Sequence, residues 1–131
     1  MSADVEPAQP AVNVKKWARA RRSGTHGLRR GAWYPVVADP PGGLVVLGVR
    51  KDNVPVLRAH VEFSETEPGH WSVVQWDEKQ AGARRASEQN YGLTYGVCPA
   101  CSERVKLATE TQRLACPDCG GEFPVDWEHP C

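Results

Sequence analysis

The hydrophobic positions of this chain fall into short runs, each closed by turn-forming residues, which is typical of small antiparallel sheets. Pro- and Gly-containing turns lie at 39–43 and 67–69. The spacing predicts about five short strands between residues 31 and 77, with Pro35 favouring an edge strand or a bulge. The runs rich in β-branched and aromatic residues are 33–37, 44–49, 54–57, 60–63 and 71–76.

Residues 28–77 resemble the SH3-like small barrels, including the KOW and Tudor types, in strand count, in strand length and in the entry Gly31-Ala32-Trp33-Tyr34. The resemblance implies a small antiparallel barrel over 31–77, in a family that uses aromatic grooves to bind ligands. An OB-like or otherwise irregular meander fits the same rhythm of strands and turns.

The segments that flank this barrel carry weaker signals. Residues 1–11 have little to bury, and we expect a disordered tail there. The segment 12–30 is predicted to be a basic arm or a short helix, because Val14, Trp17 and Ala18 share one face at helical spacing. Residues 78–92 are polar and contain no large aliphatic side chain, so we expect a linker that ends the first domain.

The cysteines carry the clearest chemistry. Cys98 and Cys101 form one Cys-x-x-Cys pair, Cys116 and Cys119 form another, and fourteen residues separate the pairs. Two thiolates at that spacing fit one tight turn, and two such turns can close a tetrahedron around a metal ion. Four soft ligands favour Zn²⁺, although iron uses the same ligand set. A redox pair would need a βαβ context, and the sequence around these cysteines does not provide one.

Residues 93–127 resemble the zinc-ribbon family, whose rubredoxin-like knuckles include the Cys-Pro-Asp-Cys-Gly-Gly pattern found at 116–121. The resemblance implies a zinc ribbon over 93–131 in which short hairpins surround one ion. We expect strands at 104–108 and 113–115, with a hairpin tip at 110–112. Because four protein ligands leave no position for a reactive water, we expect a structural site and no enzymatic activity.

Two other arrangements of metal ligands are weaker. His60 and Glu62, taken with the first cysteine pair, are similar to the H-x-E and P-C-x-x-C pattern of zinc deaminases. Val97 stands where that pattern has proline, and the second cysteine pair would be unexplained. His129 and Cys131 follow the second knuckle closely, but we interpret them as a loose tail.

The charge is balanced overall and uneven along the chain. There are 16 basic and 16 acidic residues, so the whole chain is not a polyanion binder. Residues 11–35 nevertheless contain seven basic residues and no acidic one, which favours contact with RNA or DNA phosphates, while a solvated arm without function stays open. The predicted contacts are Lys15, Lys16, Arg19, Arg21, Arg22, Arg29 and Arg30.

The sequence also limits which partners and which cellular location we expect. No apolar run approaches the length of a membrane span, and the N-terminus lacks the features of a secretory signal, so we expect a cytoplasmic protein. Five tryptophans either fill small cores or offer an aromatic platform to a base or peptide. We expect a zinc-binding, nucleic-acid-associated protein with no evident small-molecule substrate. The alternative is an adaptor that docks on a larger protein assembly through the barrel or the acidic ribbon.

Overall fold

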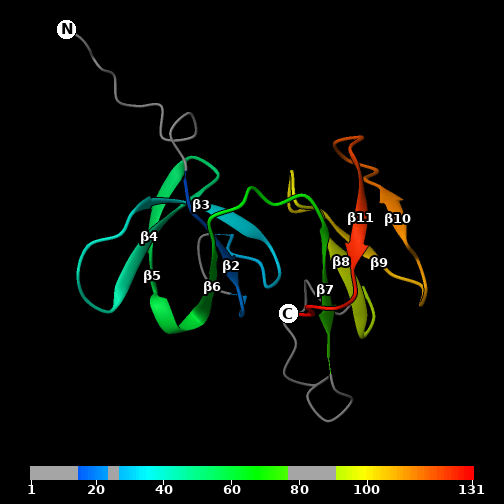
Figure 1. Ribbon diagram of the computed structural model, residues 1–131, viewed down its shortest axis with the longest axis horizontal. Coiled ribbons are helices and arrows are strands. Elements are labelled where there is room, and N and C mark those ends of the chain that lie inside the picture. Colours follow the sequence, from blue (N-terminus) through cyan, green and yellow to red (C-terminus); the bar gives the residue numbers. More distant parts are fainter. Residues whose placement is uncertain (1–14, 24–26, 77–90) are drawn as a thin grey trace, which may run out of the picture.

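The structure is a computed structural model that describes residues 15–23, 27–76 and 91–131. These residues form two five-stranded sheets that stand side by side (Figure 1). The mainly β class is therefore confirmed, and the described residues contain no α-helix. The predicted tail at 1–11 and all but the last two residues of the predicted linker at 78–92 lie outside the described residues.

The first sheet is a curled antiparallel meander, consistent with a small β-barrel. Its strand order is β5-β4-β3-β2-β6. A 3-10 turn at Arg58–His60 returns the chain so that the last strand pairs with the first one. A register shift between Val36 and Ala38 places an irregularity next to Pro35, as the proline suggested. The strands are β2 (Trp17–Ala20), β3 (Trp33–Ala38), β4 (Leu44–Val49), β5 (Asp52–Leu57) and β6 (Val61–Ser64).

The prediction of a helix or free arm over 12–30 is wrong for β2. This strand lies between β3 and β6 and is hydrogen-bonded to both. Ala18 and Ala20 are fully buried there, because small side chains let the strand lie deep in the curled sheet. Packing with two partners overrides the weak helical pattern of a four-residue segment.

The second sheet combines two hairpins with one strand from the preceding part of the chain. Its order is β10-β11-β7-β8-β9, with a parallel contact between β11 and β7. The strands are β7 (Trp71–Gln75), β8 (Thr94–Val97), β9 (Arg104–Lys106), β10 (Arg113–Ala115) and β11 (Glu122–Asp126).

Strand β7 was expected to close the barrel, and the structure places it at the centre of the second sheet instead. Its register with β8 pairs Ser72 with Val97 and Gln75 with Thr94. The first four residues of β7 are all buried. A strand covered on both faces suits a central position, which explains why three of its first four residues are apolar and Ser72 is buried with them.

The expected hairpin tip at 110–112 is also not found. Strands β9 and β10 lie on opposite edges of the second sheet, so the segment 107–112 crosses from one hairpin to the other. The hairpins instead join β8 to β9 and β10 to β11, with one cysteine pair in each connection. This connectivity brings the two Cys-x-x-Cys turns together.

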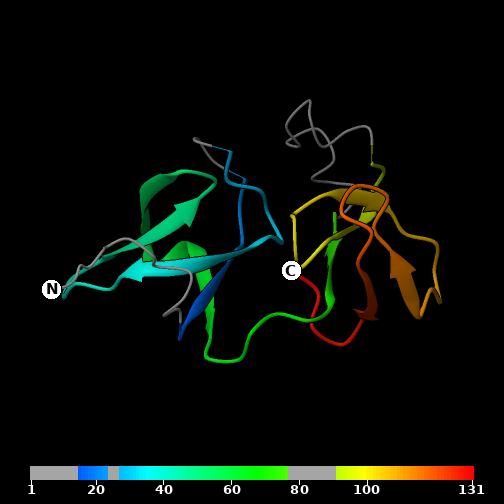
Figure 2. The same ribbon diagram turned by 90° about the horizontal axis from the view of Figure 1, so that it is seen from above.

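The two sheets share a hydrophobic core. Val74 and Val97 of the second sheet belong to the same buried cluster as Ala20 of the first. The backbone of Cys131 donates to Val73, and its thiol donates to the Ala20 carbonyl at 3.3 Å. Both views show the C-terminus between the sheets (Figures 1 and 2). We call this contact the seam; it comprises Ala20, Gly31, Val74, Val97 and Cys131.

Candidate metal centre

The four paired cysteines converge on one point. Their sulfur atoms all lie within 4.8 Å of one another. The Sγ atoms of Cys98 and Cys119 are 3.8 Å apart, and those of Cys101 and Cys116 are 3.6 Å apart. Four sulfurs bound tetrahedrally to zinc at about 2.3 Å are separated by about 3.8 Å. The arrangement therefore fits one tetrahedral metal ion.

The two knuckles have the same backbone geometry. In the first, Cys98 N–H donates to Glu103 O at 2.8 Å, and Ser102 N–H donates to Cys98 O at 3.0 Å. In the second, the equivalent bonds join Cys116 to Gly121 and Gly120 to Cys116, again at 2.8 and 3.0 Å. The repetition shows that each turn is built to present two sulfurs to a common centre.

Backbone N–H groups also point at the first sulfur of each knuckle. Ala100 N–H donates to Cys98 Sγ at 3.4 Å, and Asp118 N–H donates to Cys116 Sγ at 3.4 Å. Such donors stabilise a thiolate, which is the form that binds a metal. The knuckles therefore offset part of the negative charge that four thiolates bring together.

The residue after each second cysteine has a left-handed backbone. Gly120 has φ 79° and Ser102 has φ 68°. Glycine adopts this region freely, whereas other L-residues are disfavoured there. The first knuckle is therefore the more strained of two otherwise matching turns.

We predict that Ser102→Gly stabilises the protein by about 1 kcal/mol, because it removes the left-handed penalty at that position. Urea unfolding of the metal-loaded protein measures the change. The Arg29 hydrogen bond to Ser102 uses the backbone carbonyl and is retained in the variant. Gly120→Ser, the reverse exchange in the second knuckle, should lower stability by a similar amount; a loss of stability in Ser102→Gly would contradict the interpretation.

Burial and hydrogen bonding act differently on the thiols. Burial raises the pKa of Cys98 and of Cys101 above the usual range of a thiol. Burial also opposes ionisation of Cys116, but hydrogen bonds from the backbone N–H groups of Cys119 and Asp118 and from the thiols of Cys101 and Cys119 together outweigh it and lower the pKa of that thiol. Because the metal binds thiolates, loading this site displaces protons, and the affinity falls as the pH is lowered.

Two tryptophans hold the shell around the centre. Trp71 is fully buried, and its indole N–H donates to Leu114 O at 2.8 Å. Trp127 donates to Thr111 O at 2.7 Å. The first bond holds β10 itself and the second holds the segment before it, so the two indoles help to position the second knuckle.

The predicted nucleic-acid contacts do not form one surface. Lys15, Arg21 and Arg22 are exposed, and none has an ion pair among the described residues. Lys16 is paired with Asp39 at 2.8 Å. Lys16 and Arg58 both hydrogen-bond Asp39, which lowers the pKa of its carboxyl.

The other three predicted contacts reach across to the second sheet. Arg19 is buried, binds both carboxylate oxygens of Glu62 and donates to Ser72 Oγ. Arg29 donates to the Ser102 carbonyl at 2.7 Å, beside the first knuckle. Arg30 donates to the Cys131 carbonyl at 2.8 Å. Their role at the junction was missed because a basic residue looks the same in sequence whether its guanidinium faces solvent or protein.

The weaker ligand arrangements find no support in the described residues. Within them, the four cysteines are the one group of three or more potential ligands close enough to share an ion. Glu62 is bound to Arg19, and His129 is exposed against Asp126. Cys131 packs at the seam, so the expectation of a loose tail is wrong for this residue.

Comparison of the chain with protein-family models, with curated proteins and with solved structures gave no significant match. The described part of the chain contains no helix with the length and hydrophobicity needed to cross a membrane. The functional argument therefore depends on the geometry of the site.

Proposed function

We propose that the metal is zinc, that its role is structural, and that the protein is a non-enzymatic nucleic-acid-associated protein. The main support for the metal site is that the four sulfurs lie within 4.8 Å of one another. Four thiolates complete a tetrahedral shell, so no coordination position is left for a substrate or an activated water. Iron fits the same sulfurs, and elemental analysis of the purified protein distinguishes the two ions.

The nucleic-acid part of the proposal is supported by exposed cations on either side of β2. Lys15 precedes the strand, and Arg21 and Arg22 follow it, in a stretch of sequence without acidic residues. Because Arg19, Arg29 and Arg30 make contacts across the sheets, we assign phosphate contact to Lys15, Arg21 and Arg22. Binding through them releases counterions and weakens as salt increases.

The test is a shift assay with single-stranded RNA and DNA across a salt series. Changing Lys15, Arg21 and Arg22 together to Glu should remove most of the binding at low salt. It should also reduce the slope of log K against log salt by about 2, at roughly 0.7 for each lost phosphate contact. The control changes three exposed cations elsewhere, Lys51, Lys106 and Arg113, to Glu. Equal losses in both variants, or no binding by the wild type, contradict the proposal.

A protein-docking role has one specific observation in its favour. The large exposed hydrophobic residues of the described chain, Leu44, Leu57 and Phe63, all lie on the first sheet, and Leu44 is the cross-strand partner of Leu57. An adaptor would use this surface. A partner that survives nuclease treatment and is lost from Leu44→Ser/Leu57→Ser, but not from the Lys15, Arg21 and Arg22 variant, would favour the adaptor.

A further inference from the structure

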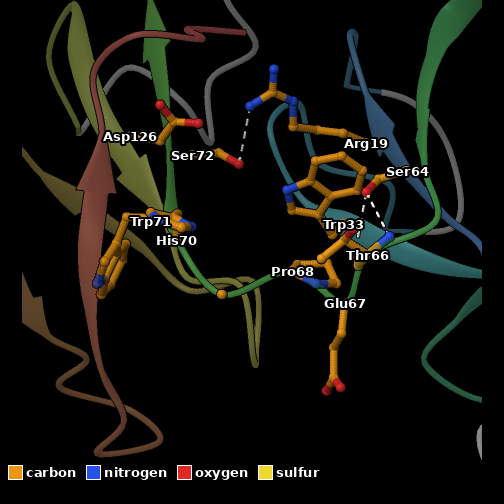
Figure 3. Close-up of a pocket in the computed structure, with 11 residues that line it drawn as sticks. Arg19, Trp33, Ser64, Thr66, Glu67, Pro68, His70, Trp71, Ser72 and Asp126 are labelled. Atoms are coloured by element: carbon orange, nitrogen blue, oxygen red, sulfur yellow. Dashed lines mark hydrogen bonds between the residues drawn. The ribbon is translucent and has the colours of Figure 1, made fainter.

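A cavity opens where the two sheets meet. Its volume is about 160 Å³. Residues of β2, β3, β6, β7 and β11 line it, together with the loop between β6 and β7 (Figure 3). Sites for drug-sized molecules have volumes of about 300–1,000 Å³. This cavity therefore accepts one ring or one side chain.

One wall of the cavity carries buried hydrogen-bond donors. The Arg19 side chain is 5% exposed, and its Nε and Nη2 atoms bind Glu62. Its Nη1 atom makes a single long bond of 3.5 Å, to the Ser72 hydroxyl, among the described residues (Figure 3). A guanidinium has five N–H groups, so Nη1 retains a donor. The Ser72 hydroxyl, which accepts from Arg19, has its own hydrogen to donate.

Asp126, in contrast, requires a hydrogen-bond donor from any occupant of the cavity. Its half-buried carboxylate lines the same cavity, and a carboxylate accepts hydrogen bonds only. The Oδ1 atom of this carboxylate accepts from Glu128 N–H at 3.2 Å, and the His129 ring nitrogen lies 3.1 Å from Oδ1 and 3.2 Å from Oδ2. The His129 side chain is 72% exposed, so an occupant of the cavity would replace it at Oδ2. A matching occupant presents an acceptor to Arg19 and Ser72 and an N–H donor to Asp126.

The charges exclude an anionic occupant. Arg19 is neutralised by Glu62, while Asp126 and Glu67 add negative charge to the lining. An anion placed here would face repulsion that no free cation of the lining offsets. Trp33 and Pro68 supply apolar wall on the side of the first sheet. A neutral planar group with adjacent acceptor and donor satisfies all of these conditions.

We propose that this cavity binds a single nucleobase in which a ring C=O lies beside a ring N–H, namely uracil, thymine or guanine. The carbonyl accepts from Arg19 and Ser72, and the ring N–H donates to Asp126. The Arg19 guanidinium already lies over the Trp33 ring, 5.4 Å from its centroid, so the base packs against Pro68 and the uncovered part of Trp33. Adenine and cytosine have no ring N–H next to a carbonyl and fit less well. Only an unpaired strand can offer this edge to a protein pocket. The inference depends on the proposed nucleic-acid function and specifies what it recognises.

The test compares fluorescence anisotropy of labelled oligouridylate, oligoadenylate and oligocytidylate of one length at one low salt concentration. Oligouridylate should bind about tenfold tighter than the other two, since one well-placed pair of hydrogen bonds discriminates bases by that order. Asp126→Asn should reduce this preference to within about twofold, because the amide can also donate and no longer requires an N–H. Glu122→Gln makes the same change at an exposed position of β11 and should leave the preference intact.

The outcomes separate the two proposals. If none of the three oligonucleotides binds, the nucleic-acid function and the base pocket both fail. If all three bind equally, the base pocket fails and phosphate contact stands; a peptide side chain in the cavity would give the same equality. If Asp126→Asn retains the full preference for uridylate while its melting temperature and metal content match the wild type, the assignment of Asp126 is overturned.

Discussion

Removal of the metal by a chelator will unfold the second sheet. A metal ion bound by the four sulfurs would join the hairpins β8–β9 and β10–β11, and the core beneath them contains five buried residues, two of which are cysteines of the proposed site. So small a core does not hold such short strands together. Structural zinc sites contribute on the order of 10 kcal/mol in comparable small folds. We therefore expect loss of β signal in circular dichroism and loss of amide protection throughout β8 to β11.

The cysteines provide a matched pair of variants for this experiment. Cys116→Ser should lose the bound metal and reproduce the chelated state, because Cys116 belongs to the cluster and is 3% exposed. Cys131→Ser should keep one metal ion per chain, because its thiol lies at the seam and donates to Ala20 O. For both variants, metal analysis measures the bound ion and hydrogen exchange measures the amide protection of the second sheet. A metal-free protein that keeps protected amides in β8 and β11 would contradict the structural role.

Replacing Gly31 with alanine will destabilise the protein by about 3 kcal/mol or more, the sum of an overpacking cost and a backbone cost. A methyl group at this position would lie 2.6 Å from Val74 Cγ2 and 3.0 Å from Val97 Cγ2. Gly31 also has φ 89°, which alanine adopts poorly. Both valines belong to the second sheet, so the added methyl forces the two sheets apart.

Gly42→Ala is the control for the backbone term. Gly42 also has a positive φ, of 116°, but nothing lies within 4 Å of the position that its Cβ would occupy. We expect Gly42→Ala to lower the free energy of unfolding by about 1–2 kcal/mol. Urea unfolding of both variants gives the difference, which measures packing at the seam. Equal losses would mean that the sheets do not press on Gly31.

The metal site could be predicted from the sequence because its geometry is local. Each cysteine pair lies within one turn, and the positive φ at Gly120 and Ser102 follows from the turn itself. What the spacing could not give is the crossing of 107–112 between the sheet edges. A short polar segment between two strands fits a hairpin tip and a crossover equally well.

For the first sheet, the mainly β fold class was predicted correctly although one of its five strands was assigned to the wrong segment. Five strands were expected between residues 31 and 77, and the first sheet has five, but β2 takes the place that was assigned to β7. The segment Trp17–Ala20 contains two alanines and an arginine and has no strong strand preference. The run at Trp71–Val74 is apolar enough for either sheet. Partner choice depends on packing between distant segments, which local pattern does not encode.

The central position of β7 also determines the order in which the second sheet can form during protein synthesis. Its parallel neighbour begins only at Glu122, near the end of the printed sequence. As the polypeptide leaves the ribosome, the largely apolar segment Trp71–Val74 therefore emerges long before both neighbouring strands, β8 and β11, have been synthesised. Nascent chains with such uncovered segments are prone to misassociation. We expect chaperone engagement to be concentrated at this strand, and capture of the ion to be the last event of maturation.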